Sequence, residues 1–222
     1  MVPIPEGLPP AHAACCEPLA CVLYALDQVT LSPGDEVALL GSGALGLLFL
    51  QELRRRGNRV LVVGRSQTKL AQARRFGAEV ALSIQEVKDP VAEIRSLSNG
   101  GKGVDLAIEA VGQPHIWEQA LRMTRKGGQV LLFGGCPQGT TITVDTGRLH
   151  YEEQKLIGVF HHTPSHIRAA LERLSHGMIS VTPLLSRTLP LHRLGEALEE
   201  MRRGLAFKIV IDPFLKDEAP TR

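Results

Sequence analysis

The sequence lacks the features that mark several classes of protein. Its formal charge is only +2, and its densest basic cluster is the three arginines at 54–56, so the composition does not favour nucleic acid as a partner. The longest strongly apolar run, around residues 37–50, is interrupted by three glycines and is too short to cross a bilayer. No internal repeat or low-complexity tract is present. We therefore expect a globular protein without a role in the membrane or on nucleic acid.

Cysteine is also scarce. The chain has four cysteines, at positions 15, 16, 21 and 136, and no two of them form a C-x-x-C pair. Neither a disulfide framework nor a zinc-finger arrangement is indicated by these spacings. The simplest interpretation is reduced thiols in a cytoplasmic protein.

What the sequence does contain, from about residue 35, is a regular alternation of short apolar runs with helix-like segments. This pattern is typical of a parallel sheet covered by helices on both faces. We expect an α/β fold with a doubly wound, six-stranded parallel sheet (a Rossmann fold). The expected strands are 36–41, 59–64, 78–82, 104–109, 128–134 and 155–160, and the expected helices are 44–56, 67–76, 90–98, 114–124 and 146–153.

Two flanks surround this core. Residues 1–34 begin Pro-rich and continue as one expected helix, whereas 35–162 form the expected Rossmann domain. Residues 163–222 contain two amphipathic helices, PSHIRAALERLSHG and LHRLGEALEEMRRG, and one late strand, FKIVIDP.

A glycine loop joins the first expected strand to the first core helix. Residues 41–46, GSGALG, fit G-x-G-x-x-G, with the strand EVALL before them and the helix LGLLFLQELRRR after them. This context provides a tight turn and a helix N-terminus directed at a pyrophosphate, so it predicts dinucleotide binding. A plain strand-to-helix turn, or another nucleotide-like ligand such as S-adenosylmethionine, remains the alternative.

The end of the second strand distinguishes between dinucleotides. An acid about 20 residues after the loop would hold the adenosine ribose of NAD. Here the strand ends in Gly64, Arg65 and Ser66, and Lys69 follows one helical turn later. Two cations and a hydroxyl suit a phosphate, which predicts NADP(H) in preference to NAD(H). The alternative is that Arg65 and Lys69 are ordinary surface cations.

Several segments follow the glycine loop in a characteristic order: FGAEVAL, GVDLAIEAVG, GGQVLLFGG and KLIGVFHHTP, with EPLA ahead of the loop. In these motifs the chain resembles the cofactor-binding part of the zinc-containing alcohol dehydrogenases (medium-chain dehydrogenases), and within them the sorbitol and threonine dehydrogenase branch. The resemblance covers nearly all residues from Val2 to Pro213.

The resemblance implies a set of cofactor contacts. The pyrophosphate would contact Gly41, Ser42, Gly43, Ala44, Leu45, Gly46 and, from the late strand, Lys208. The adenosine end would contact Gly64, Arg65, Ser66 and Lys69. The pocket wall and the nicotinamide edge would be formed by Ala110, Val111, Gly112, Phe133, Gly134, Gly135, Val159, Phe160 and His161. For Phe133, Val159 and Phe160, ordinary core packing is an equal alternative.

The catalytic half of such an enzyme is not found in this sequence. The family's N-terminal domain carries a Gly-His-Glu motif and most of the catalytic zinc ligands, and no Gly-His-Glu occurs here. Only Glu17, in EPLA, matches a residue next to the catalytic zinc, so we expect zinc only if another segment supplies the remaining ligands. Favourable placement at a helix start is the alternative for Glu17. His150 and the pair His161-His162 are expected to be loop or strand-end residues.

The function implied is hydride transfer between a secondary alcohol, or its ketone, and the nicotinamide of NADP. No catalytic residue is predicted within the chain, which we expect to be a fragment or truncated reading frame that binds cofactor without turnover. The family commonly forms dimers through its sixth strand, so a homodimer or tetramer is expected. A non-catalytic NADP(H)-binding regulatory module and a zinc-free quinone-reductase-like enzyme remain as alternatives.

Overall fold

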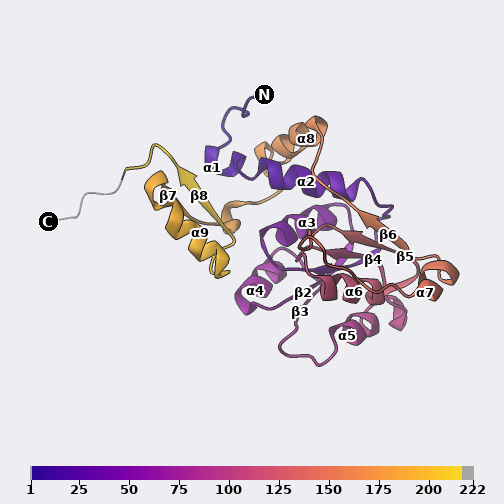
Figure 1. Ribbon diagram of the computed structural model, residues 1–222. Coiled ribbons are helices and arrows are strands. Elements are labelled where there is room, and N and C mark those ends of the chain that lie inside the picture. The colour runs from indigo at the N-terminus through magenta and orange to yellow at the C-terminus, as the bar shows by residue number, and fades with distance from the viewer. Residues whose placement is uncertain (1, 217–222) are drawn as a thin grey trace.

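Six strands form a single parallel sheet at the centre of the molecule, in the order β3-β2-β1-β4-β5-β6 (Figure 1). The computed structural model describes residues 2–216. The strands of this sheet are β1 (Glu36–Leu40), β2 (Arg59–Gly64), β3 (Val80–Ser83), β4 (Val104–Glu109), β5 (Thr124–Leu132) and β6 (Lys155–Gly158). The order reverses between β1 and β4, so the predicted doubly wound Rossmann fold is confirmed.

Helices cover both faces of the sheet. The helices of the described residues are α1 (Pro10–Ala13), α2 (Cys16–Leu26), α3 (Ala44–Arg55), α4 (Gln67–Arg75), α5 (Pro90–Ser96), α6 (Pro114–Met123), α7 (Thr146–Tyr151), α8 (Pro164–Ser175) and α9 (Leu194–Arg202), with short 3₁₀ turns at Asn99–Gly101, Thr182–Leu184 and Leu191–Arg193. Among these helices of the described chain, none is long and apolar enough to cross a membrane.

Each face of the sheet has its own hydrophobic core, because successive side chains of a strand point to opposite faces. Val37 and Leu39 of β1 point into one core with side chains of α2, α3, α4 and α8, whereas Ala38 and Leu40 point into the other with α5 and α6. Helices α2 and α8 therefore share a core with the sheet, although they come from the two flanks. The division into 1–34, 35–162 and 163–222 stays a proposal, and Met1 and 217–222 lie outside the described residues.

The first flank differs from the single helix expected there. The chain turns at Ala14 and Cys15, so α1 and α2 are separate helices. Pro18 explains the break, because it has no N–H to donate to the carbonyl of Ala14 and its ring would collide with that turn. Beginning at Cys16 places Pro18 in the first turn of α2, where proline is tolerated.

The last flank contains a strand that the sequence did not predict. Strand β7 (Leu185–Pro190) pairs in parallel with β8 (Lys208–Asp212), and α9 connects the two. This small βαβ unit lies to the side of the main sheet (Figure 1). Apolar and polar residues do not alternate regularly in the segment LSRTLP, and the segment ends in proline. Its sequence therefore did not predict a strand. A smaller correction concerns β5, which begins at Thr124, four residues before its expected start.

Candidate functional site

The glycine loop lies where β1 ends and α3 begins, and the backbone there is packed tightly. A β-carbon placed on Gly46 would lie 2.0 Å from the carbonyl oxygen of Gly41, so no larger residue fits at position 46. Around Gly43 the protein leaves open space, with no atom within 4 Å of such a β-carbon. Gly43 is the N-cap of α3 and offers no side chain to its first turn. The free N–H groups of that turn face a space that an anion could enter.

The loop after β4 lies against the glycine loop. Glu109 at the end of β4 is fully buried, and its carboxylate accepts hydrogen bonds from the backbone N–H groups of Val111 (2.8 Å) and Gly112 (2.9 Å). Burial raises the pKa of Glu109, and these hydrogen bonds partly offset the shift. A β-carbon on Gly41 would lie 3.1 Å from the Ala110 carbonyl oxygen. Glu109 thus holds the 110–112 segment beside the glycine loop, a role that the sequence did not assign.

The residues predicted for the adenosine end gather at the end of β2. Arg65 is exposed, whereas Lys69 is half-buried and its Nζ lies 5.5 Å from the centre of the Phe207 ring. Burial and then the charge of Arg65 lower the pKa of Lys69, so the two cations are close enough to interact. The Ser66 hydroxyl is the N-cap of α4, because it accepts a hydrogen bond from the Lys69 backbone N–H (3.4 Å).

A cavity of about 340 Å³ connects the glycine loop with the two flanks. Predicted residues lining it are Glu17, Ala44, Leu45, Phe133 and Lys208. Residues that the sequence did not predict there are Cys15, Pro18, Cys21, Leu48, Leu184, Met201 and Phe207. Most of the unpredicted residues belong to α1–α2 or to the C-terminal βαβ unit, whose position relative to the loop depends on tertiary packing alone.

The remaining predicted contacts lie around the ends of β5 and β6. Phe133 lines the cavity and also packs edge-on against Phe49, with ring centres 4.9 Å apart, so core packing is observed and its contact with the nicotinamide stays a prediction. Val159 packs against the core of α2, α3 and α8. Phe160 is 92% exposed, so core packing is wrong for this residue. Gly134 and Gly135 lie against Gly112, and the Gly134 carbonyl accepts a hydrogen bond from the Trp117 indole (3.0 Å).

Glu17 has three neighbours that can bind metal. Its Oε1 accepts a hydrogen bond from the Cys21 thiol (3.2 Å) and lies 3.9 Å from His162 Nε2. One ligand atom from each of Glu17, Cys21, His161 and His162 lies within 4.8 Å of the others. Burial, and then the hydrogen bond to Glu17, raise the pKa of Cys21 to about 12. The sequence could have predicted that Cys21 lies next to Glu17, because the two residues are four positions apart on a helix. Nothing in the sequence predicted that His162 lies near either of them.

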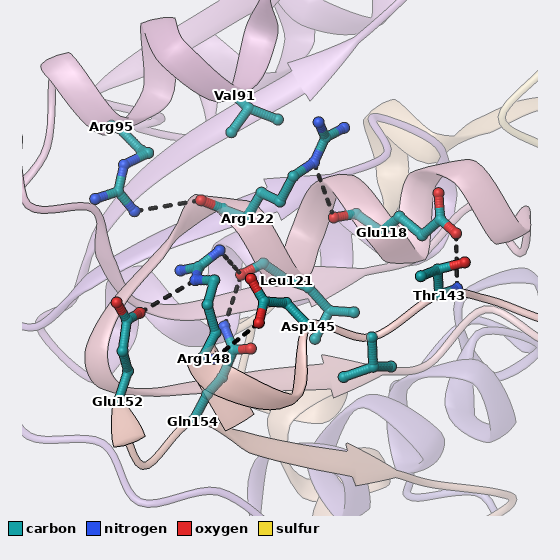
Figure 2. Close-up of a pocket in the computed structure, with 11 residues that line it drawn as sticks. Val91, Arg95, Glu118, Leu121, Arg122, Thr143, Asp145, Arg148, Glu152 and Gln154 are labelled. Atoms are coloured by element: carbon teal, nitrogen blue, oxygen red, sulfur yellow. Dashed lines mark hydrogen bonds and ion pairs between the residues drawn. The ribbon is translucent and has the colours of Figure 1, made fainter. Parts of the chain in front are cut away.

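A larger cavity of about 670 Å³ lies elsewhere, among side chains of α5, α6 and α7 and the segment before α7 (Figure 2). Three arginines and three acids line it, namely Arg95, Arg122, Arg148, Glu118, Asp145 and Glu152. Figure 2 shows the Arg148 side chain directed at Glu152, and the ion pair between them is 3.1 Å long. These charges offset one another, and none of the predicted cofactor contacts lines this cavity, so we place the candidate site at the smaller one.

Comparisons with known proteins identify related dehydrogenases. A family profile described as zinc-binding dehydrogenase matches residues 44–176. The chain is 27% identical to a sorbitol dehydrogenase of Halalkalibacterium halodurans over 95% of its length, and 26% identical to an L-threonine 3-dehydrogenase of Bacillus velezensis over 94%. It covers 61% and 60% of those two proteins.

Among solved structures, a zinc-binding dehydrogenase from Sinorhizobium meliloti bound to NADP is similar over 95% of this chain and 61% of its own, with a TM-score of 0.88 and 30% identity. An alcohol dehydrogenase from Thermus sp. ATN1 has a TM-score of 0.83 at 28% identity. The chain thus spans about three fifths of the length of these relatives.

Proposed function

Because this chain belongs to the zinc-binding dehydrogenase family, we propose that it is the cofactor-binding portion of an NADP(H)-dependent alcohol or polyol dehydrogenase. Its role is to hold the nicotinamide that exchanges a hydride with a secondary alcohol or the corresponding ketone. The names of relatives that act on sorbitol and threonine support a small hydroxylated substrate.

The observation that carries the preference for NADP(H) is the pair Arg65 and Lys69. The charge of Arg65 acts on Lys69, and within residues 2–216 neither side chain forms an ion pair with an acid. Two neighbouring cations without a counter-charge are unfavourable, and a phosphate group on the adenosine ribose would relieve that repulsion. An NAD site would instead have a carboxylate here, which would repel the same phosphate.

The other parts of the proposed site have separate roles. The N–H groups at the start of α3 and the Lys208 ammonium would bind the pyrophosphate, while Ala110, Val111 and Gly112 would line the wall of the pocket. Phe133 and the 159–161 segment would lie along the nicotinamide. When bound, zinc would polarise the alcohol oxygen as a Lewis acid, and Glu17, which lines the cavity, is the residue that would face it.

Binding measurements test this proposal directly. We expect the purified chain to bind NADPH more tightly than NADH, and Arg65→Gln to weaken NADPH binding while leaving NADH binding unchanged. Arg75→Gln is the matched control, because Arg75 is an exposed cation at the far end of the same helix, α4. Equal affinity of the unchanged chain for the two cofactors would refute the preference.

Activity assays separate the alternatives. We expect the 222 residues to bind NADPH without oxidising polyols, because the family's Gly-His-Glu motif does not occur in them. Efficient alcohol oxidation by this chain with added zinc would contradict that expectation. Zinc-independent reduction of a quinone would instead favour the quinone-reductase alternative.

Assembly and location are further parts of the proposal. Strand β6 lies at the edge of the sheet, so its outer backbone groups are available to pair with a second copy in a homodimer. The four cysteines are free thiols, which supports a reducing compartment such as the cytoplasm.

A further inference from the structure

The turn between α5 and β4 contains Asn99-Gly100, the one place in the sequence where glycine follows asparagine. Its backbone is left-handed, with a φ of +46° at Asn99 and +64° at Gly100. Asparagine adopts this conformation more readily than other residues with a side chain. We propose that Asn99 is a site of spontaneous deamidation, and that the carboxylate formed there prevents the turn from closing again.

The reaction needs only the chain and water. The backbone nitrogen of Gly100 forms a bond to Cγ of Asn99, and the bond from Cγ to the side-chain nitrogen breaks. Ammonia leaves, and a five-membered succinimide ring remains in the backbone. Water then opens this ring at either carbonyl, which gives aspartate or isoaspartate, and the released proton is taken up by the ammonia.

The attacking nitrogen is accessible. Gly100 is exposed, and a β-carbon placed on it would meet no atom within 4 Å, so water and base can reach its N–H. Among residues 2–216, no hydrogen bond holds this N–H, whereas the next one, of Gly101, donates to the Ser98 carbonyl (2.9 Å). Glycine also has no side chain that would shield the nitrogen. The Gly100 nitrogen is therefore free to attack once its proton is removed.

Two hydrogen bonds restrain the Asn99 amide while the turn is closed. Its Nδ2 donates to the Gly103 carbonyl (2.9 Å) and to Asp105 Oδ2 (3.1 Å). Departure of this nitrogen breaks both bonds, so the reaction follows a local opening of the turn. None of the residues Asn99–Gly101 is buried, and exposed turns of this kind open more readily than the core unfolds.

The product would meet two acids. The Asn99 backbone N–H donates to Glu36 Oε2 (2.6 Å), and its amide donates to Asp105. Burial raises the pKa of Asp105, but hydrogen bonds from the Glu36 N–H and the Asn99 amide, together with Arg125, outweigh burial and lower it. Deamidation would thus replace a donor by a carboxylate that faces the ionised Asp105. Isoaspartate would also lengthen the backbone by one CH₂ group. Either product would keep the turn open.

The modification would act on the fold and not on the cofactor. Glu36 begins β1 and Val104 begins β4, so the turn lies at the amino ends of these strands. The glycine loop follows the carboxyl end of β1, at the opposite edge of the sheet. This inference therefore goes beyond the proposed function and does not depend on it.

Mass spectrometry of the aged protein tests the proposal. The purified, folded chain is incubated in mildly alkaline buffer made with heavy-oxygen water and is then digested with trypsin in ordinary water. Cleavage after Arg95 and Lys102 releases residues 96–102, and heavy oxygen at Asn99 marks conversion that preceded the digestion. We expect progressive labelling of this peptide, and faster labelling when the chain is unfolded in urea. Absence of heavy oxygen at Asn99 in the folded chain, whether or not the unfolded chain converts, would overturn the proposal.

The chain supplies its own control. Asn58, its other asparagine, is buried and precedes Arg59, whose N–H donates to the Asp35 carbonyl (3.1 Å). We expect no conversion at Asn58. Asn99→Gln keeps an amide but would have to form a larger ring, so it should remove the label from residues 96–102. Equal labelling of Asn58 and Asn99 in the folded chain would overturn the role given to the turn.

Two variants measure the consequence of conversion. Asn99→Asp introduces the carboxylate directly and should lower the ratio of folded to unfolded chain roughly fivefold to thirtyfold in urea unfolding, because a hydrogen bond becomes a contact between like charges. Gln85→Glu makes the same exchange at an exposed residue and should change the ratio by no more than about twofold. Folded Asn99→Asp should bind NADPH as the original chain does. A stability equal to that of the original, or loss of NADPH binding by the folded variant, would overturn this part of the proposal.

Discussion

Gly64, at the end of β2, lies so close to Ser42 of the glycine loop that a β-carbon on it would be 2.4 Å from the Ser42 hydroxyl oxygen and 3.0 Å from the Ser42 β-carbon. The absence of an acid at position 64 is therefore linked to the presence of a side chain at position 42. A change of cofactor preference must address both residues, although 22 positions separate them.

This relationship predicts the behaviour of a cofactor-switching pair. Gly64→Asp alone should destabilise the protein by about 1–3 kcal/mol, because the new side chain overlaps Ser42. Ser42→Gly removes the two nearest contacting atoms and leaves only Leu70 Cδ2 at 3.2 Å, so the double variant should recover most of the lost stability and favour NADH, whose ribose hydroxyls the new carboxylate can bind. Urea unfolding and titrations with both cofactors measure the two effects. A double variant as unstable as Gly64→Asp would contradict the explanation.

Two glycines of the loop should differ in how they respond to alanine. Gly46→Ala places a methyl group against the Gly41 carbonyl and should lower the free energy of unfolding by at least about 1–3 kcal/mol. Gly43→Ala meets no protein atom within 4 Å, so its stability should stay within about 0.5 kcal/mol of the original. Its methyl group would occupy the space proposed for the pyrophosphate, so NADPH binding should nevertheless fall. Normal NADPH affinity in Gly43→Ala would place the phosphate elsewhere.

A buried ionic cluster should control stability in acid. Glu52 of α3 is fully buried and accepts hydrogen bonds from Arg55 (2.9 Å), Arg56 (3.0 Å) and Arg173 of α8 (3.2 Å). Burial alone would raise the pKa of Glu52, but these arginines outweigh it and lower the pKa from 4.5 to about 2.

The sign of the pH dependence follows. Because the pKa is lower in the folded state, the ionised carboxylate contributes stability above pH 4.5 that is lost as the pH falls toward about 2, and that contribution is roughly 3 kcal/mol. We expect Glu52→Gln to be less stable than the original chain at pH 7 and to lose less stability as the pH falls from 4.5 toward about 2. Urea unfolding at several pH values measures both effects. Glu199→Gln, which removes an exposed partner of Arg202, is the control and should follow the original curve. Parallel curves for Glu52→Gln and the original chain would contradict the prediction.

The sheet and its glycine loop could be predicted because their signals are local. Alternating apolar runs identified all six strands of the main sheet, and the turn chemistry at Gly57 and Gly77 ended the helices within one or two residues of their observed ends. The doubly wound architecture was expected from the alternation of strands and helices, whereas the strand order is observed only in the structure. Strand β7 was missed because its residues pair with residues of β8 that lie 22 or 23 positions later, as Arg187 does with Ile209, and its own composition gives no strand signal.

The sequence by itself determined the fold, the glycine loop and the exchange of an acid for Gly64-Arg65-Ser66, since each depends on neighbours in the chain. Only the tertiary structure decided which residues Glu17 meets. Cys21 lies beside it by helical spacing, but His161 and His162 arrive from the far edge of the sheet through the packing of α2 against α3 and α8. That juxtaposition depends on long-range burial of apolar faces and on the positive φ of His161, and neither is encoded in the residues around EPLA.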